Sequence, residues 1–346
     1  MNDKAINSRN KHNSIFYLSA ILLWIVMGFS TGHADYINYE SYYDRVSSGI
    51  DVMAVEPGFL YLMKLSSTAG LNFIWFQALF SLLGFALIIS TLKRYSSLKV
   101  VLLFAYLCYP FFLDITQMRQ FMVSAIVVFA VRFLEKFSWK NLVLYVTCIA
   151  LGTTIHISSL IYLVLLLSYI SEGKKLFGYS LVITAILFIG GSMLLSSDLY
   201  QAVLGLREND ISYESGMQGV QLFLYILFYS MLIVLCVAIH RESSRLKGGI
   251  GELEFLYRVA LCTMMFIPFI LLDFQFTRFF RTTIIVLYLY ILAESSKLKT
   301  DKKRLYPLIL LVLVIGVGLR LFGPGSGYYT TLTMPILHSN YLFNLF

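Results

Sequence analysis

Hydrophobic residues form long runs along this chain, and short polar clusters rich in Lys and Arg separate one run from the next. Crossing a bilayer takes about 20 apolar residues in a helix. The recurring runs therefore predict an all-α polytopic membrane protein, a single integral membrane domain over residues 1–346 with about 11 transmembrane or partly re-entrant helices. We expect these helices at residues 14–30, 70–92, 100–113, 118–134, 141–153, 155–170, 176–195, 220–239, 255–272, 280–294 and 306–322.

Two of the expected helix pairs are short hairpins. Residues 100–134 and 141–170 each hold two helices near or below the minimum spanning length, so each pair either tilts across the bilayer or dips in and returns. Polar residues gather at both turns, in LDITQMRQF (113–121) and in TTIHISS (153–159). Pro110 suits a helix that breaks just before the first of these elbows.

The composition agrees with this pattern, since 58% of the residues are hydrophobic, only 13% are charged, and the mean hydropathy is +0.76. A soluble domain does not need so much apolar surface for one core. All four cysteines lie inside apolar runs without metal-ligand spacing, which favours small buried hydrophobes over disulfides or ligands. The chain lacks a Walker loop, an HExxH pair and a strand followed by GxGxxG, so we expect no cofactor and no bound metal.

The positive charges indicate how the helices are oriented. The net charge is +8, and the basic residues stand at the ends of apolar runs, where they set topology rather than bind nucleic acid. With the N-terminus in the cytoplasm, most of the 27 lysines and arginines fall on the cytoplasmic side, and the opposite orientation would invert this ratio. The outer side then holds Arg45, Lys64, Arg119, Arg207, Arg278, Arg281 and Arg320. The first apolar run is long for a signal peptide and many spans follow it, which favours an uncleaved first helix.

The few outer cations are mostly arginines, and Arg119, Arg278 and Arg281 lie within or beside apolar helix ends. A charge is unfavourable there, by about 2.5–3.5 kcal/mol at a helix centre and less near the interface. The ordinary alternative is that each arginine reaches lipid headgroups or pairs with Asp114 or Asp273, and Asp114 could neutralise Arg119 across the elbow. Three arginines on the side with the fewest cations favour an anionic substrate instead.

The segment TRFFR, residues 277–281, suits a diphosphate. Arg278 and Arg281 are three positions apart and so share one helix face. A helix that starts here leaves free backbone N–H groups pointing outward, and guanidinium groups bind phosphate with paired hydrogen bonds. Arg119, Arg278 and Arg281 are therefore the candidates for binding a substrate diphosphate.

Candidate acid–base residues lie at the same outer boundary. His156 stands at the second elbow, where it is either a structural histidine or a general base or phosphate donor. Glu56 precedes a Pro-Gly pair, so we expect it in a fixed turn at the membrane surface. Asp35 and Asp114 compete with both for the role of base.

The first outer loop is rich in carboxylates and tyrosines, a combination that suits carbohydrate, because acids accept hydroxyl protons and rings stack on sugar faces. Tyr36, Tyr39 and Tyr43 are the candidates for contacting a sugar. The alternative is an ordinary solvated loop with an aromatic belt at the interface.

Four stretches of the chain carry a resemblance. They are the first loop ending in EPGFLYLMKL, the elbow MRQFMVSAIVVFAVRFLEK, the turn IHISSLIYLVLLLSY, and RFFRTTIIVLYLY. Together, in this order and spacing, they resemble the EpsG-like, Wzy-type polysaccharide polymerases of bacteria. The likeness covers most of the chain, from about Asp35 to about Glu294.

The resemblance implies a multi-pass glycosyltransferase of the bacterial inner membrane in an O-antigen, capsule or exopolysaccharide pathway. Such enzymes polymerise oligosaccharide repeat units carried on undecaprenyl diphosphate at the periplasmic face, with the lipid diphosphate as leaving group. The outer side is then the periplasm, which would hold the C-terminus and residues 31–58, 196–219 and 323–346. The implied partners are the lipid-linked oligosaccharide, the lipid bilayer and a polysaccharide chain-length regulator, and not nucleic acid.

Two other functions would use similar features. An O-antigen ligase, which transfers the finished chain to the lipid A core, needs the same diphosphate cradle, but residues 196–219 are short for the large periplasmic loop of ligases. A flippase or other transporter of lipid-linked oligosaccharide predicts charges along a path through the helices and a two-fold internal repeat. Here the intramembrane charges cluster on the outer half and no repeat stands out, so the polymerase is preferred.

Overall fold

The computed structural model describes residues 3–33, 35–50, 52, 55–170, 173–195, 219–247, 252–272, 274–298 and 302–343, and the regular elements within these ranges are all helices. The all-α prediction is confirmed. The longer helices are α1 (Asp3–Gly28), α2 (Tyr36–Ser47), α3 (Pro57–Thr68), α4 (Phe73–Tyr95), α5 (Lys99–Cys108), α7 (Met118–Ala130), α8 (Trp139–Ile155), η2 (Ile157–Tyr169), α9 (Gly173–Leu195), α11 (Gly219–Lys247), α12 (Glu254–Thr263), α14 (Thr277–Ser295) and α15 (Lys302–Phe322). The shorter ones are α6 (Phe111–Thr116), η1 (Val131–Leu134), η3 (Met264–Phe266), α13 (Ile267–Leu272), η4 (Phe274–Phe276), η5 (Tyr329–Thr333) and α16 (Met334–His338).

Helix lies in every range that the apolar runs predict, with three informative differences. The run 100–113 breaks at Pro110, where α5 has ended and α6 begins, as a proline in that position favours. The helix predicted to end at 239 continues as α11 to Lys247. Residues 31–58, expected as a loop, contain α2, whose buried tyrosines fold against α3 and α4.

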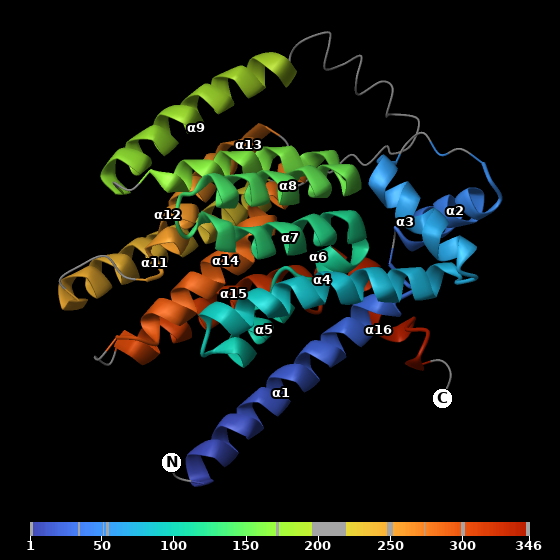
Figure 1. Ribbon diagram of the computed structural model, residues 1–346, viewed down its shortest axis with the longest axis horizontal. Coiled ribbons are helices and arrows are strands. Elements are labelled where there is room, and N and C mark those ends of the chain that lie inside the picture. The colour runs from blue at the N-terminus through green and yellow to red at the C-terminus, as the bar shows by residue number, and fades with distance from the viewer. Residues whose placement is uncertain are drawn as a thin grey trace.

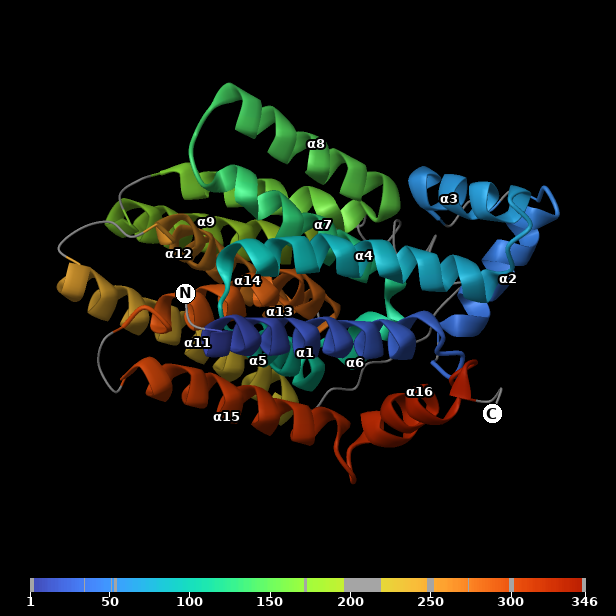
Figure 2. The same cartoon turned by 60° about the horizontal axis from the view of Figure 1, so that its bottom comes forward.

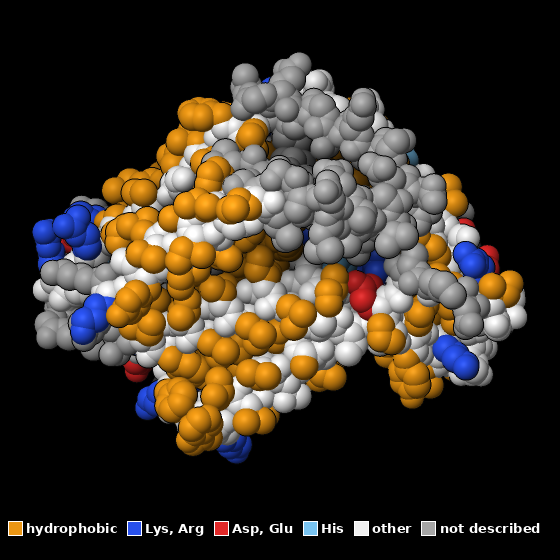
Figure 3. All heavy atoms as spheres, turned by 90° about the horizontal axis from the view of Figure 1, so that it is seen from above, with side chains coloured by type: hydrophobic (Ala, Val, Ile, Leu, Met, Phe, Trp, Pro, Cys, Tyr) orange, Lys and Arg blue, Asp and Glu red, His pale blue; other side chains and the backbone are white. Residues whose placement is uncertain are grey.

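Three described helices are long and apolar enough, by length and composition, to cross a membrane. They are Phe73–Tyr95, Leu222–Arg245 and Lys302–Phe322. Shorter apolar helices accompany them at Asn13–Gly28, Lys99–Cys108, Trp139–Ile155, Ile157–Tyr169 and Lys175–Gly190. Large hydrophobic side chains remain exposed along these helices, and Figure 3 shows hydrophobic side chains across much of one face, with Lys and Arg mainly toward its two ends. Such a surface is that of a membrane protein.

The long helices run back and forth between two ends of one bundle (Figure 1). One end holds α2, α3 and α16, together with the C-terminal part of the chain, and is named the α3 end here. The chain begins at the opposite end, as a second view also shows (Figure 2). The described residues of segments 31–58 and 323–343, both expected on the outer side, thus share the α3 end. Residues 196–218 of the third expected outer segment lie outside the described residues.

Helix α14 is the centre of the bundle. Every residue from Phe280 to Ser295 is buried, because α5, α7, α11, α12 and α15 surround this helix. A helix that is apolar on all sides has no preferred face and belongs inside a core. Arg281, in the first turn of α14, is consequently buried as well, at 3% exposure.

Chain segments far apart in sequence close the α3 end. The backbone N–H of Thr31 donates to the carbonyl of Ser339 at 2.8 Å, and Tyr341 donates to Phe29 at 2.8 Å. From α4, the buried side chain of Gln77 donates to the carbonyl of Ser30 at 2.8 Å and also to those of Met27 and Gly28. These bonds satisfy carbonyl groups that the end of α1 leaves without partners.

Candidate functional site

Glu56 joins three elements at the α3 end. It is the N-cap residue of α3, and Pro57 behind it has the backbone angle that a first helical position needs. The Glu56 side chain does not cap its own helix. One carboxylate oxygen instead accepts a 3.0 Å hydrogen bond from the backbone N–H of Ile157, the first residue of η2, and the other accepts one from Arg119 of α7.

A close contact between α3 and α8 fixes this junction. A Cβ on Gly58 would lie 2.3 Å from Oγ1 of Thr154 and 2.7 Å from its carbonyl oxygen. Only glycine allows the start of α3 to approach the end of α8 this closely. The Pro-Gly pair therefore brings Glu56 within reach of the η2 N-terminus.

His156 completes the junction. Its Nδ1 atom lies 3.7 Å from the Glu56 carboxylate and accepts a hydrogen bond from the backbone N–H of Ser158 at 3.2 Å. A ring nitrogen that accepts a hydrogen bond carries no proton, so the arrangement assigns the proton of the neutral imidazole to Nε2.

Arg119 faces an aromatic and acidic surrounding. Its guanidinium carbon lies 5.9 Å from the ring centre of Tyr39 and 6.0 Å from that of Phe59, both in cation–π range. Asp35 also lies nearby: burial raises its pKa, and the charges of Arg119 and Arg278 partly offset that rise. Asp35 therefore stands within the electrostatic reach of two of the predicted arginines.

At Glu56 the balance between burial and neighbouring groups is the reverse of that at Asp35. Burial by itself would raise the pKa of this carboxyl, but Arg119, the amide of Ile157 and His156 lower it more. The net result is a pKa below the usual value, so Glu56 is ionised near neutral pH.

Asp114 and Arg281 form a second, deeper pair. Oδ1 of Asp114 lies 3.2 Å from Nε of Arg281, and Oδ2 accepts a 2.9 Å hydrogen bond from the hydroxyl of Tyr106. Arg281 also donates to the side chain of Gln117, which stands between α6 and α7. Asp114 therefore neutralises Arg281, and Arg119 has Glu56 as its carboxylate partner.

Arg278 takes a different position from Arg281. Its side chain turns back toward η4, where Nε donates to the carbonyl of Gln275 and Nη2 to its side-chain oxygen, each at 2.8 Å. Arg278 as a residue is only partly buried. The two arginines of TRFFR thus differ: one is enclosed beside Asp114 and the other reaches the surface at the start of α14.

A polar hub, made of Gln120, Ser124, Ser158, Tyr162 and Thr282, connects these pairs across α7, η2 and α14. Gln120 donates to Thr282 at 2.7 Å and accepts from Ser158 at 2.9 Å, and Ser124 donates to Thr282 at 3.0 Å. The sequence shows polar residues at both elbows but assigns them no role. Their contacts could have been predicted, because buried polar residues in an apolar helix need partners on neighbouring helices.

The three predicted sugar-contacting tyrosines lie in different surroundings. Tyr36 donates to Glu40 at 3.1 Å and is partly exposed, whereas Tyr39 is buried beside Arg119. Tyr43 is buried against α4, and its hydroxyl donates to the carbonyl of Leu71 at 2.7 Å. Tyr36 is therefore the one of these three rings that reaches the surface.

Within the described residues, no cluster of His, Cys, Asp or Glu could hold a metal ion.

The family comparison covers nearly all of these elements. The model of the EpsG family matches residues 13–324, a range that includes both charge pairs, the polar hub and α15. No curated protein and no solved structure matches the chain.

Proposed function

The chain belongs to the EpsG family of Wzy-like polysaccharide polymerases, and from this premise we propose that it polymerises lipid-linked oligosaccharide repeat units in the bacterial inner membrane. The substrate would be an oligosaccharide on undecaprenyl diphosphate. The reaction would take place at the periplasmic face, which we assign to the α3 end of the bundle. The cytoplasmic face would be the opposite end, where the chain begins.

The observation that carries this proposal is the junction of Glu56, Arg119 and His156. An ionised carboxylate, a guanidinium and an imidazole ring meet there at the N-terminus of η2, within an apolar bundle. A diphosphate needs cations and N–H donors, and a sugar hydroxyl needs a base. At this junction, groups that can bind a diphosphate lie next to a carboxylate that can act as the base.

The proposed step breaks one bond and forms one. The hydroxyl oxygen of the incoming unit attacks the anomeric carbon of the growing chain. The bond from that carbon to the diphosphate oxygen breaks, and its electron pair leaves with undecaprenyl diphosphate. The hydroxyl proton moves to a carboxylate, for which we assign Glu56. The products are a longer chain on the acceptor lipid and free undecaprenyl diphosphate.

Arg119 links substrate binding to the basicity of Glu56. While Arg119 pairs with Glu56, the pKa of the carboxyl is low, which makes it a weak base. A diphosphate that binds Arg119 would take a share of the positive charge away from Glu56. The pKa of Glu56 would then rise toward the working range, so the base would become effective when the leaving group is in place.

The remaining candidates take supporting roles in this scheme. His156 and Arg278 would donate to the diphosphate, and Asp35 lies close enough to Arg119 to compete for it. Asp114 and Arg281 are enclosed together, so we assign them the positioning of the elbow that carries Arg119.

The test is complementation of a strain deleted for the gene, scored as the length of surface polysaccharide on a gel. Wild type should restore long chains, whereas Arg119→Ala and Glu56→Gln should leave single repeats. Removing one charge contact of a transition state slows a reaction about 100- to 1,000-fold. Lys64→Ala and Asp44→Asn, at exposed positions of the same end, are matched controls that should restore long chains.

The deletion strain itself distinguishes the rival functions. Single-repeat glycan in the deletion strain supports the polymerase. Long chains that accumulate without their final acceptor would point to a ligase, and a complete loss of surface glycan would point to a flippase. Full rescue by Arg119→Ala and Glu56→Gln, at normal expression, would overturn the site assignment.

A further inference from the structure

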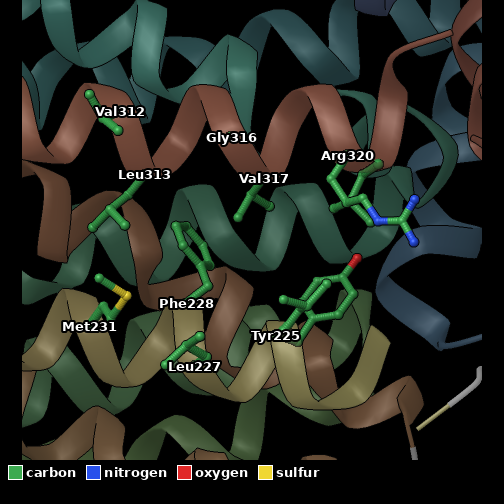
Figure 4. Close-up of a pocket in the computed structure, with 11 residues that line it drawn as sticks. Tyr225, Leu227, Phe228, Met231, Val312, Leu313, Gly316, Val317 and Arg320 are labelled. Carbon is green, nitrogen blue, oxygen red and sulfur yellow. The ribbon is translucent and has the colours of Figure 1, made fainter. Parts of the chain in front are cut away.

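A groove with a volume of about 240 Å³ runs between α11 and α15. Its walls are apolar along most of its length, with Phe228 and Met231 on one side and Val312 and Val317 on the other (Figure 4). Gly316 lies in the wall from α15, and a Cβ added there would meet no atom within 4 Å. The missing side chain therefore leaves the middle of the groove open.

The two polar residues of the groove lie together at one end. Figure 4 shows the guanidinium of Arg320 and the hydroxyl of Tyr225 at that end, with Met231 and Val312 at the other. Arg320 belongs to the last turn of α15, which is at the α3 end of the bundle. Its side chain is exposed and forms no ion pair with any described residue. An apolar groove with a cation at its interfacial end matches a lipid chain that carries an anionic head.

Aromatic rings lie between the polar end of the groove and the start of α14. The ring of Tyr225 packs against Tyr109 and Tyr229, with centroid distances of 6.3 and 6.0 Å. Tyr229 in turn stacks on Phe280 at 4.0 Å, and Phe280 precedes Arg281 in α14. A layer of aromatic rings thus separates the groove from the pair formed by Arg281 and Asp114.

We propose that this groove binds the polyprenyl chain of a lipid diphosphate and that Arg320 pairs with its diphosphate. This inference rests on the proposed function, whose reaction joins two lipid-linked units. Arg119 is assigned to the diphosphate of the donor, and the groove would hold the lipid of the acceptor. The groove extends along α15 from Val312 to Arg320, a rise of about 12 Å of helix. It therefore holds only the part of the chain next to the diphosphate, and the rest remains among bilayer lipids. A single narrow groove suits one lipid chain better than the two chains of a phospholipid. A diphosphate also brings more negative charge to Arg320 than the single phosphate of a phospholipid does.

Two variants test the groove, and each has a matched control. Gly316→Phe adds a ring to the groove wall, at a glycine whose new Cβ would meet no atom within 4 Å. Gly178→Phe adds the same ring to α9 at another exposed helical glycine with no atom within 4 Å. Arg320→Gln removes the cation, and Lys64→Gln removes an exposed cation elsewhere at the same end.

Binding is measured with the purified full-length chain by native mass spectrometry. The probe is undecaprenyl diphosphate, and the competitors are phosphatidylglycerol and inorganic diphosphate. Gly316→Phe and Arg320→Gln should each raise the Kd for undecaprenyl diphosphate by about tenfold, the usual effect of losing one charge-assisted or well-packed contact. Both control variants should bind as wild type does.

Three results would overturn the proposal. They are wild-type affinity in Gly316→Phe, displacement of the probe by phosphatidylglycerol at equal concentration, and displacement by inorganic diphosphate at equal concentration. Glycan length in the deletion strain is scored alongside. Long chains restored by wild type, together with unchanged probe binding in Gly316→Phe, would reject the groove alone. Long chains already present in the deletion strain would reject the proposed function.

Discussion

The enclosed pair of Asp114 and Arg281 gives a sharp test of how the elbow is held. Asp114 is 1% exposed and Arg281 is 3% exposed. At an effective dielectric constant of about 20, two unit charges 3.2 Å apart attract each other by about 5 kcal/mol. Removing one charge leaves the other buried without compensation, which typically destabilises a protein by about 3–5 kcal/mol.

We therefore expect Asp114→Asn and Arg281→Gln each to lower the Tm of the purified protein by more than about 5 °C. The double variant removes both charges and keeps groups that can form hydrogen bonds with Tyr106 and Gln117. Its Tm should lie above that of either single variant, since no unpaired charge remains. The assay is heat denaturation in detergent, with glycan length in the deletion strain as the second measurement.

Two outcomes would contradict this reasoning. A Tm loss in the double variant equal to the sum of the two single losses would mean that the charges do not compensate each other. A double variant that is stable but makes only single repeats would show that Arg281 contacts the substrate, contrary to its assignment as a positioning residue.

Three further predictions concern the surroundings of the site. Gly58→Ala should lower the free energy of unfolding by about 1–3 kcal/mol and shorten the glycan, because the new Cβ meets Thr154. Gly178→Ala is the control, and equal Tm values for both variants would refute the close contact. Burial lowers the pKa of His33 to about 4, so the folded state binds this proton less readily than the unfolded state, and stability should fall by about 3 kcal/mol as the pH drops from 6.5 to 4. In His33→Phe the Tm should change less over this range, and an unchanged pH dependence would reject the assignment. Gln77→Leu removes three hydrogen bonds to the segment at the end of α1 and should lower the free energy of unfolding by about 1–3 kcal/mol. Heat denaturation measures this loss, and a Tm equal to that of wild type would contradict the prediction.

The positions of the helices could be predicted because an apolar run is a local property of the sequence. The break at Pro110 followed from the chemistry of one residue. Helix α2 was missed, since its sequence, rich in tyrosine and polar residues, has the composition of a loop. Its helical face becomes apparent only when Tyr39 and Tyr43 pack against Phe59 and Phe76.

Candidate site residues could be proposed from sequence, but their pairing could not. The sequence left open that Asp114 neutralises Arg119, five positions away. The chain turns at Gln117, so the two side chains belong to different helices, and each finds its partner from a distant segment. Arg119 meets Glu56 and Asp114 meets Arg281, contacts that depend on how α3 and α14 pack.

The contact between Thr31 and Ser339 has a consequence for biosynthesis. These residues are 308 positions apart, so the bond can form only after all the helices between them have been synthesised. Until then, the amide of Thr31 and the carbonyl of Phe29 lack their partners Ser339 and Tyr341. Closing so long a loop is entropically unfavourable and depends on the helices packed between its ends. Proximity of these two positions is therefore a marker of completed assembly, and a fluorophore pair placed there would report, molecule by molecule, when a newly inserted chain becomes mature.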